Sequence, residues 1–168
     1  METMVTQDHN QIRLKNYIEN IKANQNMPMG VAGGAIAAVL GAVLWGIVTY
    51  VTNFQIGWMA VGVGILVGFA VRTFGKGLDL RFGIAGAALA LAGCLMGNIF
   101  ASCIAISNEY QVPLFQVIGS LQWSIIADIY IHTFNPIDIL FYGIALYEGY
   151  RFSFLRISEN EVAGILKP

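Results

Sequence analysis

Five polar or ionisable residues stand in otherwise apolar stretches, and they are the residues of this chain that could do chemistry. They are Asn98, Asp128, His132, Asp138 and Glu148. Ionisable groups at membrane depth usually mark ion pathways, proton relays or ligand counter-ions, because removing them from water is costly. Asp128 and His132 are one helical turn apart, a spacing that suits a proton relay or half of a metal site. The ordinary interpretation, two polar residues on the wet face of a surface helix, is favoured.

The other three residues also have ordinary structural roles. Asp138 fits the first turn of a helix, where a carboxylate meets the helix dipole favourably. Glu148 precedes Arg151 by three residues, and side chains at that spacing pair on a helix surface. Asn98 lies in the middle of an apolar run and suits a hydrogen bond between helices. These roles are favoured over catalysis.

No enzyme motif accompanies these residues. The sequence contains no HExxH, no GxSxG and no paired-Asp metal motif. Gly75, Lys76 and Gly77 lack the spacing of a phosphate-binding loop and instead predict a flexible turn whose lysine meets anionic headgroups. Cys94 and Cys103 fall on opposite faces of one helix, so they cannot bridge each other there and make no metal-ligand spacing. We therefore predict no enzymatic activity, no metal and no cofactor.

The composition is that of a membrane protein. Hydrophobic residues make up 57% of the 168 residues and charged residues only 11%, against about half and about a quarter in soluble domains. No acidic or basic residue occurs between Lys22 and Arg72, a length sufficient for two crossings of a bilayer. The formal net charge is -1 and the basic residues are scattered, so nucleic acid is not expected as a partner.

The hydropathy pattern predicts an all-α polytopic membrane bundle with four transmembrane helices in a domain at residues 29–155. The spans are expected at about residues 29–52, 56–74, 82–106 and 136–155. Thr52 to Gln55 form a tight uncharged turn between the first two spans, and Asn135 and Pro136 provide the N-cap and first position of the last span. Residues 1–28 form a cytoplasmic segment whose amphipathic helix, Asp8 to Ala23, suits a membrane surface or a partner. Residues 156–168 form a cytoplasmic tail.

Residues 113–134 are apolar but carry a polar stripe. A polar side chain recurs at every fourth position: Gln116, Ser120, Ser124, Asp128 and His132. This predicts one helix with a polar ridge, either in the plane of the outer membrane surface or re-entrant. A fifth span is disfavoured, because a central Asp costs ~2.5 to 3.5 kcal/mol on insertion scales.

The positive charges predict the orientation. All nine Lys and Arg fall into three groups, which lie before the first span, between the second and third spans, and after the last. Cytoplasmic loops carry the excess of Lys and Arg, so both termini are expected in the cytoplasm. Five spans would place Arg151, Arg156 and Lys167 outside, and this again favours four.

Small residues recur at four-residue spacing along three of the spans. Pairs expected at helix contacts are Gly34 with Ala38, Gly64 with Gly68, and Gly93 with Gly97. The ridges of the first and third spans are broader than one small bundle needs, which suggests a homo-oligomer or another membrane subunit as partner. The alternative, with equal weight, is that all ridges are used inside the bundle.

Two segments carry a resemblance to a known group. GWMAVGVGILVGFAVRTFGKG at 57–77 and DILFYGIALYEGYRFS at 138–153 resemble small uncharacterised bacterial multi-span inner-membrane proteins. Some members carry a zinc-binding module ahead of the spans, but this chain has no cysteine or histidine cluster there. The resemblance implies a bacterial inner-membrane location and no catalytic residue.

Two functions are consistent with these features. The first is a non-enzymatic scaffold or accessory subunit of a membrane complex, in contact with membrane lipids. The alternative is an oligomeric transporter or channel for small ions or solutes, with Asn98, Asp128, His132 and Glu148 along a polar path. Three of these four lie toward ends or surfaces, whereas transport sites usually lie near the midplane, so the first is favoured. A membrane enzyme would require Asp128, His132 and Asp138 around one cavity.

Overall fold

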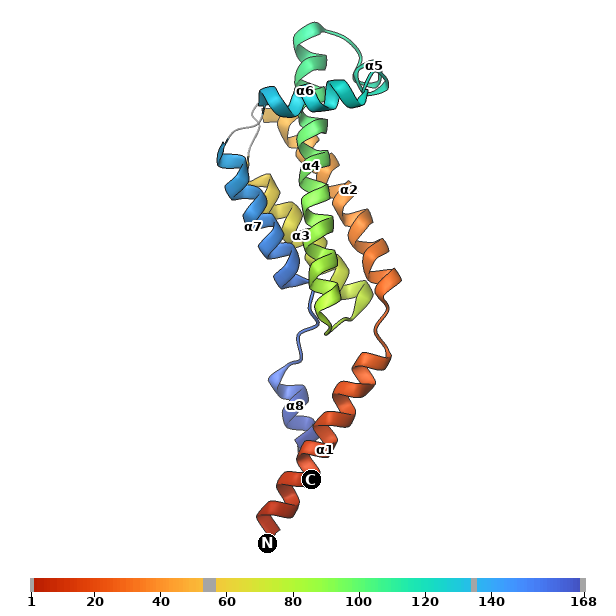
Figure 1. Ribbon diagram of the computed structural model, residues 1–168, viewed down its shortest axis with the longest axis vertical. Helices are drawn as coiled ribbons and strands as arrows, with labels where there is room; N and C mark the ends of the chain where they lie inside the picture. Colours follow the sequence, from red (N-terminus) through yellow and green to blue (C-terminus); the bar gives the residue numbers. More distant parts are fainter. Residues whose placement is uncertain (1, 53–56, 134–135, 167–168) are drawn as a thin grey trace.

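The computed structural model describes residues 2–52, 57–133 and 136–166, and in these ranges the chain forms eight α-helices and no strand (Figure 1). The predicted turn after Thr52 and the predicted N-cap at Asn135 lie outside the described residues. The helices are α1 (Glu2–Ala23), α2 (Met27–Thr52), α3 (Met59–Gly75), α4 (Leu80–Tyr110), α5 (Leu114–Gly119), α6 (Trp123–Thr133), α7 (Pro136–Phe152) and α8 (Glu159–Leu166).

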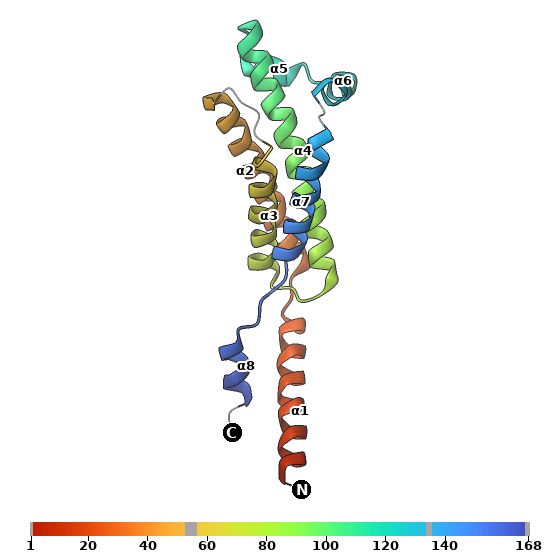
Figure 2. The same cartoon turned by 90° about the vertical axis from the view of Figure 1, so that its left-hand side faces the viewer.

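Helices α2, α3, α4 and α7 form the bundle. Helices α3 and α4 contact each other, and each also contacts both α2 and α7, whereas α2 and α7 share no contact. Helices α2 and α4 run in one direction and α3 and α7 in the other (Figures 1 and 2). We call the end of the bundle next to α1 and α8 the arm end, and the end next to α5 and α6 the cap end.

Small residues bring the helix backbones of the bundle into direct contact. A Cβ atom added to Gly64 of α3 would lie 2.6 Å from the carbonyl oxygen of Ala145 in α7. A Cβ added to Gly149 of α7 would lie 2.8 Å from the carbonyl oxygen of Gly86 in α4. Lipid tails are as apolar as the helices, so this close van der Waals packing carries the association.

The small-residue ridges are used inside the bundle. All six residues named above as helix contacts are buried: Gly34, Ala38, Gly64, Gly68, Gly93 and Gly97. The opposite face of α2 exposes large side chains instead, among them Ile36, Leu40 and Val51. This burial agrees with the alternative that the ridges are used inside the bundle. A homo-oligomer or another membrane subunit as partner stays a prediction.

Two helices are long and apolar enough to cross a membrane. These are α2, with 26 residues, and α4, with 31 residues. Helices α6 and α7 pass the same test only together, with a bend of 108° between them. Helix α3 is apolar but has 17 residues, or about 25 Å against a hydrocarbon core of about 30 Å. Over its described residues the chain is all-helical and has two or three such spans, as a membrane-associated protein does.

The predicted single helix at 113–134 is wrong, because the chain forms α5 and α6 with a break at 120–122. Gly119 and Ser120 are poor helix residues, and the Ser120 hydroxyl donates to the carbonyl of Val117 at 2.8 Å. The polar ridge is therefore interrupted. Helix α6 crosses the end of the bundle at a steep angle (Figure 1), and Trp123 at its start is 87% exposed.

Helices α1 and α8 form an arm outside the bundle. Helix α1 begins at Glu2 rather than at Asp8, and it extends away along the long axis of the molecule (Figures 1 and 2). Among the described helices it contacts only α8, and Arg13 Nη1 donates to the Ile165 carbonyl at 3.3 Å. Sequence analysis missed α8, although Ser158 and Glu161 have capping-box spacing, and the Ser158 N–H donates to Glu161 Oε2 at 2.9 Å.

The glycine-rich turn at the arm end is held at both glycines. The Asn26 N–H donates to the Gly75 carbonyl at 2.9 Å, and the Leu155 N–H donates to the Gly77 carbonyl at 2.8 Å. Lys76 between them is left-handed, with φ of 49°, and ends α3. The turn thus joins both arm linkers to the bundle, whereas the sequence had suggested a flexible loop.

Backbone contact at Gly64 gives a direct test of the packing. We expect Gly64→Ala to lower the unfolding temperature in detergent, because its Cβ meets the backbone of Ala145, with a cost of about 1 to 3 kcal/mol. Gly62→Ala is the matched control on the same helix, because nothing lies within 4 Å of its Cβ. Its stability should stay equal or rise. Equal unfolding temperatures for the two variants would contradict the packing of α3 against α7.

Candidate functional site

A polar cluster lies inside the bundle between α4 and α7. Asn98 is 2% exposed, and its Nδ2 donates to the Tyr142 hydroxyl at 3.0 Å. The Ser102 hydroxyl donates to the Asn98 carbonyl at 2.9 Å, and Cys94 Sγ lies 3.7 Å from the Ala60 carbonyl oxygen. The Asn98–Tyr142 bond joins α4 to α7, the Ser102 bond lies within α4, and the Cys94 contact joins α4 to α3. The cluster therefore has a role in helix packing.

Helix α6 is fastened to the bundle by Tyr130. Its hydroxyl donates to the carbonyl of Leu95 in α4 at 2.8 Å. The pKa of Tyr130 is raised well above its ordinary value, and burial of the phenol is the largest cause. The phenol therefore stays protonated at neutral pH and remains a hydrogen-bond donor.

Asp128 and His132 lie exposed on α6. His132 Nδ1 is 2.9 Å from the backbone carbonyl oxygen of Asp128, so the ring meets the backbone within one turn of helix. Across the described ranges, no three His, Cys, Asp or Glu residues come together as a group able to hold a metal ion. Both side chains are thus exposed and within one turn of each other, and their place on the wet face of a surface helix stays a prediction.

The predicted pair of Glu148 with Arg151 does not form. The Arg151 guanidinium lies instead near the rings of Tyr147 and Phe152, with centroids at 6.0 and 5.9 Å. Glu148 Oε2 is buried, with no hydrogen-bond partner among the described residues. Aromatic faces next to Arg151 on the same helix compete with the carboxylate for the cation. Asp138 lies in the first turn of α7, as its position after Pro136 suggested.

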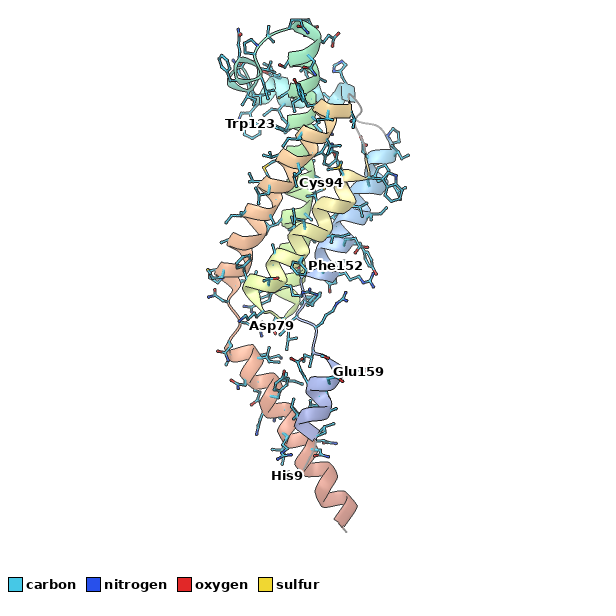
Figure 3. The ribbon with its side chains drawn as sticks, turned by 180° about the vertical axis from the view of Figure 1, so that it is seen from behind. His9, Asp79, Cys94, Trp123, Phe152 and Glu159 are labelled. Carbon is cyan, nitrogen blue, oxygen red and sulfur yellow. The ribbon has the colours of Figure 1, made fainter. Side chains whose placement is uncertain are left out.

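Both cysteines are free and buried in α4, as small packing residues would be. Figure 3 shows Cys94 within the bundle, Asp79 at the arm end and Trp123 at the cap end.

Asp79 lies 4.0 Å from Lys22 of the arm. Both side chains are about half exposed, so this ion pair contributes little.

A cleft opens between α2 and α4 at the cap end, and we call it the cap-end cleft. Its volume is about 330 Å³, and it is lined by Thr49, Ile104, Ala105, Asn108 and Glu109. Thr49 is 7% exposed, and its hydroxyl has no hydrogen-bond partner in the described part of the chain. A buried hydroxyl without a partner costs about 1 to 3 kcal/mol.

Thr49 differs from two other helical threonines of this chain. The hydroxyls of Thr52 and Thr73 each donate to the carbonyl four residues earlier, at 2.7 and 2.8 Å. The Thr49 hydroxyl makes no such bond, and its side chain lines the cleft. Sequence reasoning missed this residue, because a threonine in an apolar span normally bonds to its own helix.

A second cleft, of about 170 Å³, lies where the arm meets the bundle. Its lining residues come from α1, from both linkers of the arm end and from the turn after α3: Tyr17, Asn20, Ile21, Asn24, Lys76 and Leu155. Lys76 is the one charged group among them. No carboxylate lines this cleft, so it holds no acid–base pair.

The five residues of the predicted polar site do not form one site. Asn98 bonds to Tyr142, one turn from Asp138, whereas Asp128 and His132 lie exposed on α6 and Glu148 lies two to three turns along α7 from Asp138. Comparison of the chain with models of known protein families, with curated proteins and with solved structures finds no match. The function therefore rests on the geometry alone.

The bond between Asn98 and Tyr142 should contribute measurably to stability. We expect Tyr142→Phe to destabilise the bundle by roughly 0.6 to 1.7 kcal/mol, because Asn98 Nδ2 loses an acceptor. Tyr147→Phe, on the exposed side of α7, is the matched control and should leave stability unchanged. Reversible unfolding in mixed detergent measures both. An equal effect of the two substitutions would show that the buried bond contributes nothing.

Proposed function

We propose that this protein is a non-enzymatic scaffold or accessory subunit of a bacterial inner-membrane complex, with four transmembrane helices and both termini in the cytoplasm. The four spans of this proposal are α2, α3, α4 and α7. Helices α5 and α6 then lie at the outer surface, and the arm of α1 and α8 lies in the cytoplasm. The proposal assigns the protein no catalytic step.

The positions of the basic residues support this orientation. Every described Lys and Arg belongs to the arm, to the turn between α3 and α4 or to the adjoining helix ends, all at the arm end. The residues from Phe82 to Tyr150, which include the cap end, contain none. Positive charge gathers on the cytoplasmic side. Helices α3 and α7, each about 25 Å long, require modest thinning of the bilayer around them.

The arm is the observation that carries the proposed role. Helix α1 is 22 residues long, about 33 Å, and it makes no contact with the bundle helices. It therefore does little to stabilise the bundle. Ile12 is half exposed on it beside the charged Arg13 and Lys15. A long helix with exposed apolar and charged groups suits recognition by a partner protein.

The alternative role, an oligomeric transporter, requires polar groups along one path. Asp128 and His132 are separated from Asn98, and Asn98 is hydrogen bonded across the bundle. Glu148 Oε2 is buried and unpaired, but it has no described polar neighbour within hydrogen-bonding distance to pass an ion to. Helix packing through backbone contact also leaves little room between α3 and α7. These observations favour the accessory role.

Reporter fusions test the topology. A reporter that is active only in the periplasm should be inactive when fused after Lys167 and active when inserted between Gln111 and Pro113, at the exposed end of α4. A reporter active only in the cytoplasm should give the reverse result. Periplasmic activity after Lys167 would reject the four-span topology.

Partner recovery tests the proposed role. We expect affinity purification from native membranes in mild detergent to recover a specific second polypeptide, and Ile12→Glu to reduce that recovery at least about fivefold by placing a charge on the apolar contact. Gln11→Glu is the control, because it adds the same charge to an adjacent exposed position. Both variants should keep the parent unfolding temperature.

Repeated purification of the parent protein without any other polypeptide would reject the accessory role. Equal recovery of the second polypeptide with Ile12→Glu and with the parent would show that the partner does not bind this face of α1.

A further inference from the structure

The cap end of the bundle is electronegative. Helices α2 and α4 are parallel, and both end there (Figure 2). The carboxyl ends of α2 and α4 carry partial negative charge, and the amino ends of α3 and α7 at the same end carry partial positive charge, so the charged side chains decide the net charge of the cap end. Glu109, Asp128 and Asp138 add carboxylates, and no Lys or Arg occurs between Arg81 and Arg151. His132 is the one basic residue of the described cap end. A cation is therefore attracted to this end.

The cap-end cleft lies within this negative region, and its polar groups occupy two levels. Asn108 and Glu109 come from the last turn of α4 and form the rim. Glu109 is exposed and makes no ion pair with a described residue. Thr49 lies deeper, because it is 7% exposed whereas Asn108 is partly exposed and Glu109 is exposed.

We propose that the cap-end cleft binds the primary ammonium headgroup of an ethanolamine phospholipid. The ammonium lies at the rim, where the Glu109 carboxylate and the Asn108 amide oxygen accept its N–H groups. The buried Thr49 hydroxyl donates to a phosphate or ester oxygen and so gains the partner that it lacks among the described residues. The two carbons of the headgroup lie against Ile104 and Ala105. This inference does not depend on the partner protein proposed above.

The size and position of the cleft fit a headgroup. About 330 Å³ is at the lower end of the range of small-ligand pockets, so the cleft can hold a headgroup and not the acyl chains. The order of groups matches a phospholipid in a membrane, with the ammonium nearest to water and the phosphate deeper.

The chemistry of the rim predicts which headgroup is preferred. An ethanolamine ammonium has three N–H donors for carboxylate and amide oxygens. A choline headgroup carries the same charge with no N–H donor, and a glycerol headgroup carries no cation. Retention should therefore follow the order phosphatidylethanolamine, phosphatidylcholine, phosphatidylglycerol.

Native mass spectrometry of the full chain, released from bilayers with equal amounts of these three lipids, tests the proposal. The parent should retain phosphatidylethanolamine preferentially. Glu109→Gln should lower that retention about tenfold, because it removes the charged acceptor and keeps the shape. Thr49→Val should lower it severalfold, and Ala105→Phe should lower it by filling the cleft.

The matched controls are Glu159→Gln and Thr73→Val, which make the same changes at the arm end. Both should retain the lipid as the parent does. Glu109 is exposed, so Glu109→Gln is expected to fold, and an unchanged unfolding temperature checks this.

Equal retention of the three lipids by the parent would overturn the proposal, and so would an unchanged preference in Glu109→Gln. A second arm adds free ethanolamine to the parent protein. Stabilisation by millimolar free ethanolamine that is lost in Glu109→Gln, with no lipid preference, would overturn the lipid assignment and identify a soluble amine as the ligand. A preference for phosphatidylethanolamine, with no stabilisation of the parent by free ethanolamine, supports the phospholipid as the ligand.

Discussion

Direct backbone contact between helices is the constraint on which the rest of this structure depends. In a lipid environment, burial of apolar surface gives little drive for helices to associate, so packing has to be close. Gly64 against Ala145 and Gly86 against Gly149 bring α7 onto α3 and α4 at distances that no side chain would allow. The same small residues exclude space from the bundle interior. A ligand therefore finds room at the two ends of the bundle rather than in its interior.

A dry and tightly packed interior also restricts its polar groups. Asn98 and Tyr142 pair across helices, and Tyr130 uses a backbone carbonyl of α4 as its acceptor. These bonds cost little because both partners are already held by the helices that carry them. Thr49 differs, because its side chain is also buried but its hydroxyl has no hydrogen-bond partner within the described chain. A buried hydroxyl without a partner on the wall of a cleft is better explained by a ligand than by packing.

The long apolar helices could be predicted from the sequence, because length and hydropathy are properties of a single segment. Helix α2 starts two residues before the predicted span, and α4 extends four residues beyond it. Features that depend on competition between neighbours were harder to predict. Arg151 prefers the faces of Tyr147 and Phe152 to Glu148, and Ser120 breaks a helix that the polar periodicity had favoured. The cap-end cleft needed two helices in register, which no single segment reveals.

The two ends of the bundle differ in charge for a reason built into its topology. Helices α3 and α7 end at the arm end, where Arg72 and Arg151 lie in their last turns and offset the negative ends of the helix dipoles. Helices α2 and α4 end at the cap end without a basic residue in the last turn. Helices α3 and α7 begin at the cap end, so their partial positive charge offsets part of the negative charge of these two helix ends. The carboxylates of Glu109, Asp128 and Asp138, with no Lys or Arg between Arg81 and Arg151, then make the cap end the one that attracts cations.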